Sequence, residues 1–249
     1  MKALSRVLIA VCLVISASGQ HAVFADAAHD DYVRAQRFIQ NGQMADAVKV
    51  LTRAIQAEPK FLNAYIARGF ALSRMGKLEQ ALNEYEKVLG LSANNAVALC
   101  NKGFCLYKMG KLDDALVCMN RAHELDPERP DFLANRAEVL LKLGQTDRAL
   151  EDANTSIAFD DTDADPYITR ADALMQKKRV KEALKDYSKA ISLNPDPVHM
   201  FHPEGESYYK RAQIYNELGN REAAARDMQT SRTLGYTPEL IGTKSDTSN

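Results

Sequence analysis

One alanine column repeats along this sequence with a constant period, and it limits the fold more than any other feature. The column stands at 34-residue spacings and then at one spacing of 41: Ala47, Ala81, Ala115, Ala149, Ala183 and Ala224. A period of roughly 20 to 50 residues is typical of stacked copies of one short unit, because each copy buries its apolar face against the next. We therefore expect six copies of one unit.

Two more columns of small residues keep the same register. Twelve residues before the alanines stand Ala35, Gly69, Gly103, Ala137, Ala171 and Ala212, and seven residues after them stand Ala54, Val88, Ala122, Ser156, Ala190 and Ser231. Small side chains let two helix backbones approach closely. Large apolar residues follow at offsets of three and four, which belong to one helical face. Each copy is therefore expected to contain two closely packed helices.

Glycine separates these two expected helices in five of the six copies: Gly42, Gly76, Gly110, Gly144 and Gly219. Glycine takes the left-handed backbone that ends a helix without a steric cost. The fifth copy has Lys178 here, which predicts either a strained lysine or a different turn. Each copy is thus a predicted helix hairpin.

These columns resemble the tetratricopeptide repeat, whose period is 34 residues. The expected repeats are 28–61, 62–95, 96–129, 130–163, 164–197 and 205–238, with an insertion at 198–204. The resemblance implies an all-α fold, a right-handed superhelical solenoid of six helix-turn-helix hairpins over residues 26–238. A flexible tail is expected at 239–249.

A basic residue occupies the column where the family usually has leucine: Arg34, Arg68, Lys102, Arg136, Arg170 and Arg211. Four of the six have an acid sixteen residues later: Glu84, Asp152, Asp186 and Asp227. This spacing predicts ion pairs between the two helices of a repeat, the alternative being a column that binds a ligand. Arg34 and Lys102 meet Val50 and Cys118 at that offset, so they are the freer candidates for a ligand.

Residues 1–25 have the pattern of a secretory signal peptide. Lys2 and Arg6 precede the apolar run 7–15, and small residues at Val23 and Ala25 favour cleavage before Asp26, with a cut after Gly19 as the alternative. The run is about half as long as a membrane helix requires, so a cleaved leader is favoured over a retained anchor. We expect export, to a bacterial periplasm or medium rather than a eukaryotic secretory pathway, and no stable membrane insertion after cleavage.

Three cysteines remain beyond the leader, Cys100, Cys105 and Cys118, and an odd number cannot all pair within one chain. Burial as small apolar side chains is the favoured role, with one disulfide or a metal or redox role as alternatives.

In the family, first-helix positions 2, 5, 9, 12 and 13 line the concave side of the superhelix, where partner peptides lie. The residues that the resemblance places there as a partner-binding groove are Tyr32, Ile66, Phe70, Arg74, Phe104, Tyr107, Lys108, Asn135, Glu138, Lys142 and Asp172. The groove is thus expected to change from aromatic and basic to acidic along its length. Asp131, Asp165, Glu206 and Glu217 add to the acidic part, and Lys142 is expected to be its main positive charge. The alternative is that Ile66, Phe70 and Phe104 fill contacts between neighbouring helices.

Other site chemistries have weaker support. Asn135 matches one position of the carboxylate clamp known in this family, but Asp165 would repel the carboxylate that a clamp holds, so no clamp is expected. His199, His202 and Glu204 could ligate zinc, yet a solvated loop is favoured there. No phosphate loop or nucleophile motif is present, so we expect no catalytic residue, no metal and no cofactor.

The expected function is therefore protein binding. With 32 Lys and Arg against 33 Asp and Glu, the chain lacks the basic excess typical of nucleic-acid binding. We expect an exported module that binds a peptide or protein in its groove, as an adaptor or scaffold of an envelope or secretory assembly. A homo-oligomeric spacer is the alternative, since the last repeat has no obvious polar cap, and a metal-dependent enzyme is a further one.

Overall fold

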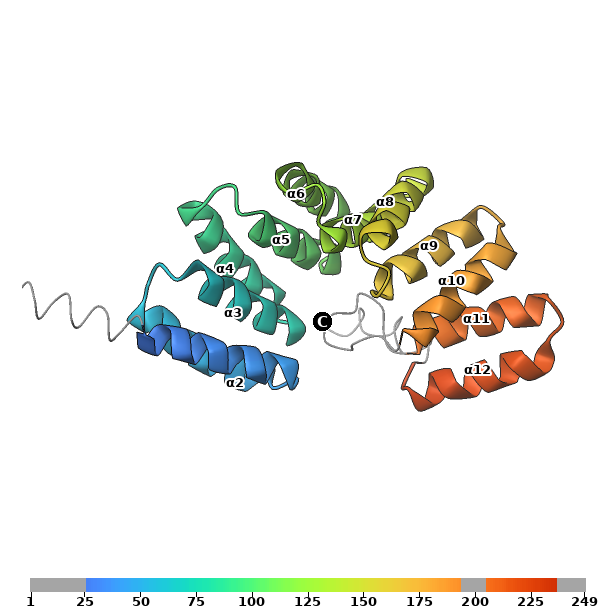
Figure 1. Cartoon of the computed structure of the whole chain (residues 1–249), viewed down its shortest axis with the longest axis horizontal. Coiled ribbons are helices and arrows are strands. Elements are labelled where there is room, and N and C mark those ends of the chain that lie inside the picture. The colour runs from blue at the N-terminus through green and yellow to red at the C-terminus, as the bar shows by residue number, and fades with distance from the viewer. Residues whose placement is uncertain (1–25, 194–204, 237–249) are drawn as a thin grey trace, which may run out of the picture. The chain divides into compact units, whose positions relative to one another are not determined.

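The computed structural model describes residues 26–193 and 205–236, and this part of the chain consists of helices joined by turns, with no strand (Figure 1). Residues 26–40 are helical. The helices that follow are α2 (Met44–Ala57), α3 (Leu62–Arg74), α4 (Leu78–Leu91), α5 (Ala96–Lys108), α6 (Leu112–Leu125), α7 (Pro130–Lys142), α8 (Thr146–Phe159), α9 (Asp165–Gln176), α10 (Val180–Ser192), α11 (Glu206–Glu217) and α12 (Arg221–Thr233). The predicted all-α class is confirmed.

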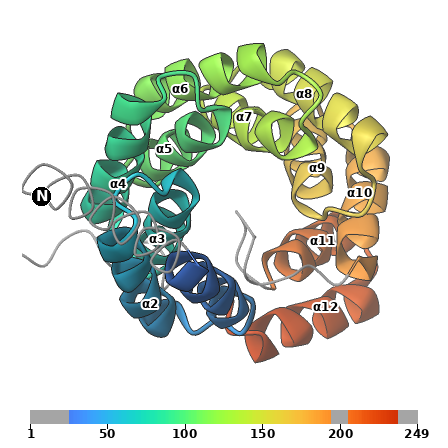
Figure 2. The ribbon, with the colours of Figure 1, turned by 60° about the vertical axis from the view of Figure 1, so that its left-hand side comes forward.

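The chain divides into two compact units, Met1–Met109 and Gly110–Asn249, called here the N-terminal and the C-terminal unit. Helices that follow one another pack together within each unit, from α2 to α5 in the first and from α6 to α12 in the second. First helices also contact the next first helix, α3 against α5 and α7 against α9. In the C-terminal unit α7, α9 and α11 form one layer and α8, α10 and α12 the other (Figure 2).

Members of the three columns of small residues lie on paired helices that contact each other, namely α3 with α4, α7 with α8, α9 with α10 and α11 with α12. All members of the alanine column are buried, as are those of the two flanking columns, Gly69 and Gly103 included. Large side chains pack beside them, with Tyr85 buried in the N-terminal unit and Tyr187 in the C-terminal unit. Close approach of the backbones thus depends on the small residues, as the sequence predicts.

The turn inside each hairpin has one geometry. The glycine of the turn takes a positive φ, between 73° and 77° at Gly42, Gly76, Gly110, Gly144 and Gly219. After Gly42, Gly76, Gly144 and Gly219 the next residue donates its N–H to a carbonyl five residues back, as Gln145 does to Leu140 at 2.9 Å. Lys178 has φ 60°, and Arg179 makes the same bond to Leu174 at 2.9 Å. Of the two expectations for the fifth repeat, the left-handed lysine is confirmed.

Candidate protein-binding surface

The first helices of the N-terminal unit present a group of aromatic and apolar side chains flanked by two cations. We call this group the aromatic face, and it comprises Tyr32, Ile66, Phe70, Phe104 and Tyr107 with Arg74 and Lys108. The five apolar or aromatic side chains are half-buried and the two cations are exposed. Residues four apart share one side of a helix, and α3 packs against α5, so the sequence places these side chains on neighbouring helices.

Ring and cation contacts hold the side chains of the aromatic face in place. The Tyr32 ring lies 5.1 Å, centre to centre, from the ring of Phe61, a residue next to this face in the N-terminal unit. The Lys108 ammonium lies 5.3 Å from the centre of the Phe104 ring and 5.5 Å from that of Tyr107. Such cation–π contacts hold the ammonium beside the rings and leave it hydrated on its outer side. A partner would therefore meet apolar surface and positive charge together.

Ile66 differs from its neighbours on this face. It packs against a buried cluster formed by Leu72, Ala81, Tyr85 and Cys105, so part of its side chain belongs to the core. The core-filling alternative predicts low accessibility for Ile66, Phe70 and Phe104 together, whereas all three keep an intermediate exposure.

The basic column forms the predicted ion pairs between the two helices of a repeat in four of the repeats. Arg136 donates hydrogen bonds to both carboxylate oxygens of Asp152, from Nε to Oδ2 at 2.6 Å and from Nη2 to Oδ1 at 2.8 Å. Arg170 binds Asp186 in the same way, and Arg211 binds Asp227. Arg68 pairs with Glu84 at 2.6 Å. The structural interpretation of this column is confirmed for these four residues.

Each of these arginines also reaches back to the preceding repeat, which the sequence analysis missed. The second-helix residues that accept a hydrogen bond from Nη1 are Thr52 for Arg68, Asn120 for Arg136, Asn154 for Arg170 and Ser188 for Arg211. The signal was present, because the first three acceptors lie sixteen residues before their arginine and the fourth lies 23 before it, across the seven-residue insertion. One guanidinium therefore joins two repeats.

The two basic residues expected to be freer have different surroundings. Lys102 forms an ion pair with Glu86 of the preceding repeat at 3.1 Å, so the expectation is wrong for this residue. Its acid lies sixteen residues before the lysine, whereas the acids of the four arginines lie sixteen residues after them. The Arg34 guanidinium stacks over the Phe38 ring at 5.5 Å, and its side chain is exposed.

Most carboxylates expected in the acidic part of the groove have a partner within the C-terminal unit. Asp131 pairs with Arg129 at 2.7 Å. Glu138 is buried, accepts a hydrogen bond from Thr169 at 3.2 Å and lies 3.5 Å from the Lys142 ammonium. This side chain is therefore part of the packing between α7 and α9 rather than of an open surface.

Lys210 neutralises two further carboxylates. This corrects the expectation that Lys142 is the main positive charge in the acidic part of the groove. Its ammonium lies 2.5 Å from Asp172 and 2.7 Å from Glu206, and the Tyr187 hydroxyl also donates to Asp172. Burial lowers the pKa of Lys210, but the adjacent carboxylates outweigh this effect and the pKa is raised. The ammonium therefore stays charged, and the acidic surface of this unit is smaller than the sequence suggests.

Models of the tetratricopeptide repeat match this chain along most of its repeats. Residues 96–129, 130–151, 164–197 and 205–231 match models described as Tetratricopeptide repeat, and residues 74–110 match one described as TPR repeat. Together these matches cover more than half of the chain. The chain belongs to the tetratricopeptide repeat family.

Solved structures agree with this assignment. The structure of pilF from Pseudomonas aeruginosa is 20% identical and covers 88% of this tetratricopeptide repeat protein and 96% of its own chain, with a TM-score of 0.68. TTC0263, a thermophilic TPR protein of Thermus thermophilus, is 18% identical over 76% of this chain and 98% of its own, with a TM-score of 0.64. YrrB, described as a TPR protein with an unusual peptide-binding site, is 23% identical over 76% and 94%, with a TM-score of 0.51. These TM-scores show a common fold. A comparison with curated proteins gave no match.

The three cysteines of this tetratricopeptide repeat protein are not joined by disulfides in the described structure. Cys100 and Cys105 are buried, whereas Cys118 is half-buried. Burial raises the pKa of the Cys105 thiol to about 11, although a hydrogen bond with Ser73 lowers it. A thiol with such a pKa is protonated near neutral pH and acts as an apolar side chain.

Several expectations fall outside the described residues. The leader at 1–25, the loop with His199 and His202, and the tail at 239–249 are among them. Within residues 26–193 and 205–236, no group of three potential metal ligands was found. None of the helices in these two stretches combines the length and the apolar character that a membrane crossing requires.

Asn135 lies half-buried on α7, in the C-terminal unit, and does not belong to the aromatic face.

Proposed function

We propose that this tetratricopeptide repeat protein is an exported binding module that holds a peptide segment or a partner protein on its aromatic face. The observation that carries the proposal is the combination of half-buried rings with the exposed cations Arg74 and Lys108. The groove positions in the first three repeats carry no carboxylate. Apolar side chains on a solvent-accessible surface commonly mark a site that a partner covers.

The chemistry of the face suggests an apolar segment with acidic neighbours. Rings such as Phe70 and Phe104 bury apolar side chains, and Arg74 and Lys108 attract carboxylates beside them. A preformed helical surface loses little conformational entropy when a segment docks, so binding needs no chemical step. YrrB, which shares the fold, is itself described as having a peptide-binding site. An adaptor or scaffold role in an envelope or secretory assembly is consistent with this chemistry.

Export rests on the signal-peptide pattern of residues 1–25. The mass of the chain isolated from the producing cell tests it. A mature chain that begins at Asp26 supports export through a cleaved leader, and an intact chain that begins at Met1 contradicts it.

The binding proposal is tested with the double variant Phe70→Ala/Phe104→Ala. We expect the partner captured by the wild-type chain to be lost, because both rings contribute apolar contact area. The free energy of unfolding should change less than in Leu140→Ala, a fully buried site where truncation costs about 2–5 kcal/mol. Affinity capture and urea unfolding provide the two measurements.

Phe159→Ala is the matched control, since Phe159 is an exposed phenylalanine at the end of α8. It should capture the same partner as the wild-type chain. If the double variant loses stability as much as Leu140→Ala, the two rings are core residues and the aromatic face is not a binding surface. Unchanged capture by the double variant would have the same consequence.

A further inference from the structure

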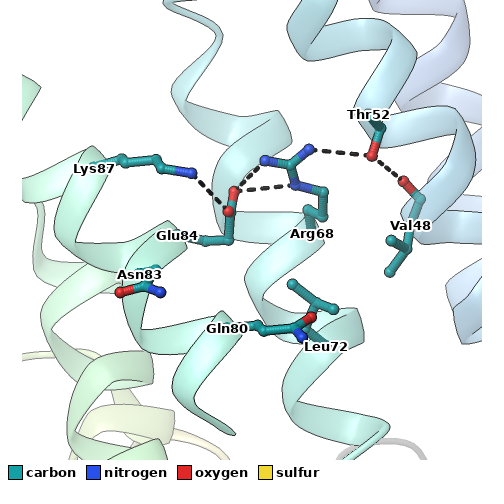
Figure 3. Close-up of a pocket in the computed structure, with 8 residues that line it drawn as sticks. All are labelled: Val48, Thr52, Arg68, Leu72, Gln80, Asn83, Glu84 and Lys87. Carbon is teal, nitrogen blue, oxygen red and sulfur yellow. Dashed lines mark hydrogen bonds and ion pairs between the residues drawn. The ribbon is translucent and has the colours of Figure 1, made fainter. Parts of the chain in front are cut away.

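A pocket of about 270 Å³ lies between α2, α3 and α4 of the N-terminal unit (Figure 3). Its lining residues are Val48, Thr52, Arg68, Leu72, Gln80, Asn83, Glu84 and Lys87. None of them belongs to the aromatic face. The volume is small compared with pockets for drug-sized ligands, which are roughly 300–1,000 Å³, and suits a single side chain.

A row of charged and polar groups crosses this pocket, as Figure 3 shows. The Lys87 ammonium donates to Glu84 Oε1 at 3.0 Å. Arg68 donates to the other oxygen of Glu84 through Nε at 3.0 Å and Nη2 at 2.6 Å, and to Thr52 through Nη1 at 3.1 Å. These bonds take three of the five N–H groups of the guanidinium, so it keeps donor capacity.

This arrangement departs from the equivalent pairs in the other repeats. Arg136, Arg170 and Arg211 each bind both oxygens of an aspartate, and each pair is neutral. In the pocket, Arg68 uses one oxygen of the longer Glu84, and Lys87 takes the other. Two cations thus share the Glu84 carboxylate, which gives the pocket lining a net positive charge. In the fifth repeat Lys189 occupies the column of Lys87, but its ammonium lies over the Tyr167 ring.

The remaining lining residues indicate what kind of group the charge would hold. Val48 and Leu72 provide apolar contacts, and the exposed amides of Gln80 and Asn83 can donate hydrogen bonds. A ligand with a short apolar stem and a terminal carboxylate matches both features. We propose that the pocket binds a glutamate side chain of a partner polypeptide.

The position of the two cations supports this orientation. The Arg68 side chain is 14% exposed and lies deep, whereas that of Lys87 is 53% exposed. A carboxylate would therefore meet Lys87 first and then share the donors of the guanidinium. The inference is independent of the aromatic face, because it uses other residues and another kind of contact.

Nuclear magnetic resonance titration of the full chain tests the proposal with three probes. They are N-acetyl-glutamate N-methylamide, the matched N-acetyl-glutamine N-methylamide, and free glutarate. We expect the glutamate probe to shift the side-chain amide signals of Gln80 and Asn83, with a Kd of about 1–10 mM for one isolated side chain. The glutamine probe should bind at least threefold more weakly.

Lys87→Gln should weaken binding of the glutamate probe about threefold to fivefold, because it removes the exposed cation. Lys189→Gln is the matched control. Lys189 occupies the same column in the fifth repeat and lies 5.9 Å from the Tyr167 ring centre, as Lys87 lies 5.7 Å from that of Tyr65. It should leave binding unchanged.

Equal binding of the glutamate and glutamine probes would overturn the proposal, as would shifts that remain in Lys87→Gln or that Lys189→Gln reduces equally. Absence of shifts up to about 50 mM of the glutamate probe would also overturn it. Binding of glutarate without the glutamate probe would identify a site for free dicarboxylates and reject a polypeptide side chain as the occupant. The aromatic-face variants are measured separately, so either proposal can fail alone.

Discussion

Lys178 has a backbone conformation that the other hairpin turns of the described structure assign to glycine. Its φ is 60°, and its turn makes the same hydrogen bonds as the turn at Gly144. A side chain in the left-handed region costs roughly 1–2 kcal/mol, because its Cβ approaches the following carbonyl. The surrounding helices α9 and α10 therefore impose this conformation on an unfavourable residue.

Lys178→Gly should raise the free energy of unfolding by about 0.5–1 kcal/mol. The relieved strain exceeds the entropy that glycine adds to the unfolded chain. Urea unfolding followed by circular dichroism measures the change. Gly144→Lys is the reverse control and should lower stability by a similar amount. A neutral or destabilising Lys178→Gly would show that this turn is not strained.

At the scale of helices, the pair α3 and α4 depends on the missing side chain of Gly69. A Cβ added there would lie 2.7 Å from Cε1 and 2.9 Å from Cζ of the Tyr85 ring. It would also lie 3.3 Å from Cβ of Glu84. Tyr85 is almost fully buried, so its ring cannot swing into solvent to make room.

Gly69→Ala should therefore destabilise the chain by about 1–3 kcal/mol, because it overpacks a helix contact. Gly90→Ala is the control, since an added Cβ at Gly90 meets nothing within 4 Å and the residue lies inside α4. That variant should gain up to about 1 kcal/mol through better helix propensity. Thermal unfolding of both variants checks the contrast, and a harmless Gly69→Ala would contradict the packing argument.

At the scale of the whole molecule, side chains that join successive repeats hold the described stacks together. The arginine column does so through pairs of contacts, such as those of Arg170 with Asn154 and Asp186. Lys210 of the sixth repeat does so through Asp172 of the fifth, while Glu206 on its own helix holds the same ammonium. A solenoid lacks contacts between distant repeats, so its stability is close to a sum of such neighbour terms.

Lys210→Met should destabilise the last repeat by about 2–3 kcal/mol, because it leaves two partly buried carboxylates without their cation. Hydrogen exchange should show loss of protection in α11 and α12 and little change in α7 and α8. Arg226→Met is the control. Arg226 pairs with Glu222 four residues earlier on α12, and the two side chains are 69% and 82% exposed, so its loss should cost about 0–1 kcal/mol. Equal effects of the two variants would show that Lys210 does not join the repeats.

Much of the repeat architecture could be predicted from the sequence because it is short-range and repeated. A helix places residues at offsets of three, four and seven on one side, so the small columns could be assigned to helix contacts before any coordinates. The pairs of Arg136 with Asp152 and Arg170 with Asp186 follow from the same periodicity. Repetition makes such an offset visible, since chance agreement would not recur in four repeats.

The candidate sites depend more on tertiary structure. Asp172 and Lys210 are 38 residues apart, and the equivalent positions one repeat earlier hold Glu138 and Thr169, which hydrogen-bond to each other. The period therefore brings the two positions together, but it does not show that Lys210 binds both Asp172 and Glu206. At the pocket, Arg68 binds one oxygen of Glu84 and Lys87 binds the other, a division that the sequence alone does not reveal. Periodicity determines which residues face a neighbouring helix. Only the packed structure decides which partner each side chain meets there, because several are within reach and the least costly burial of charge selects among them.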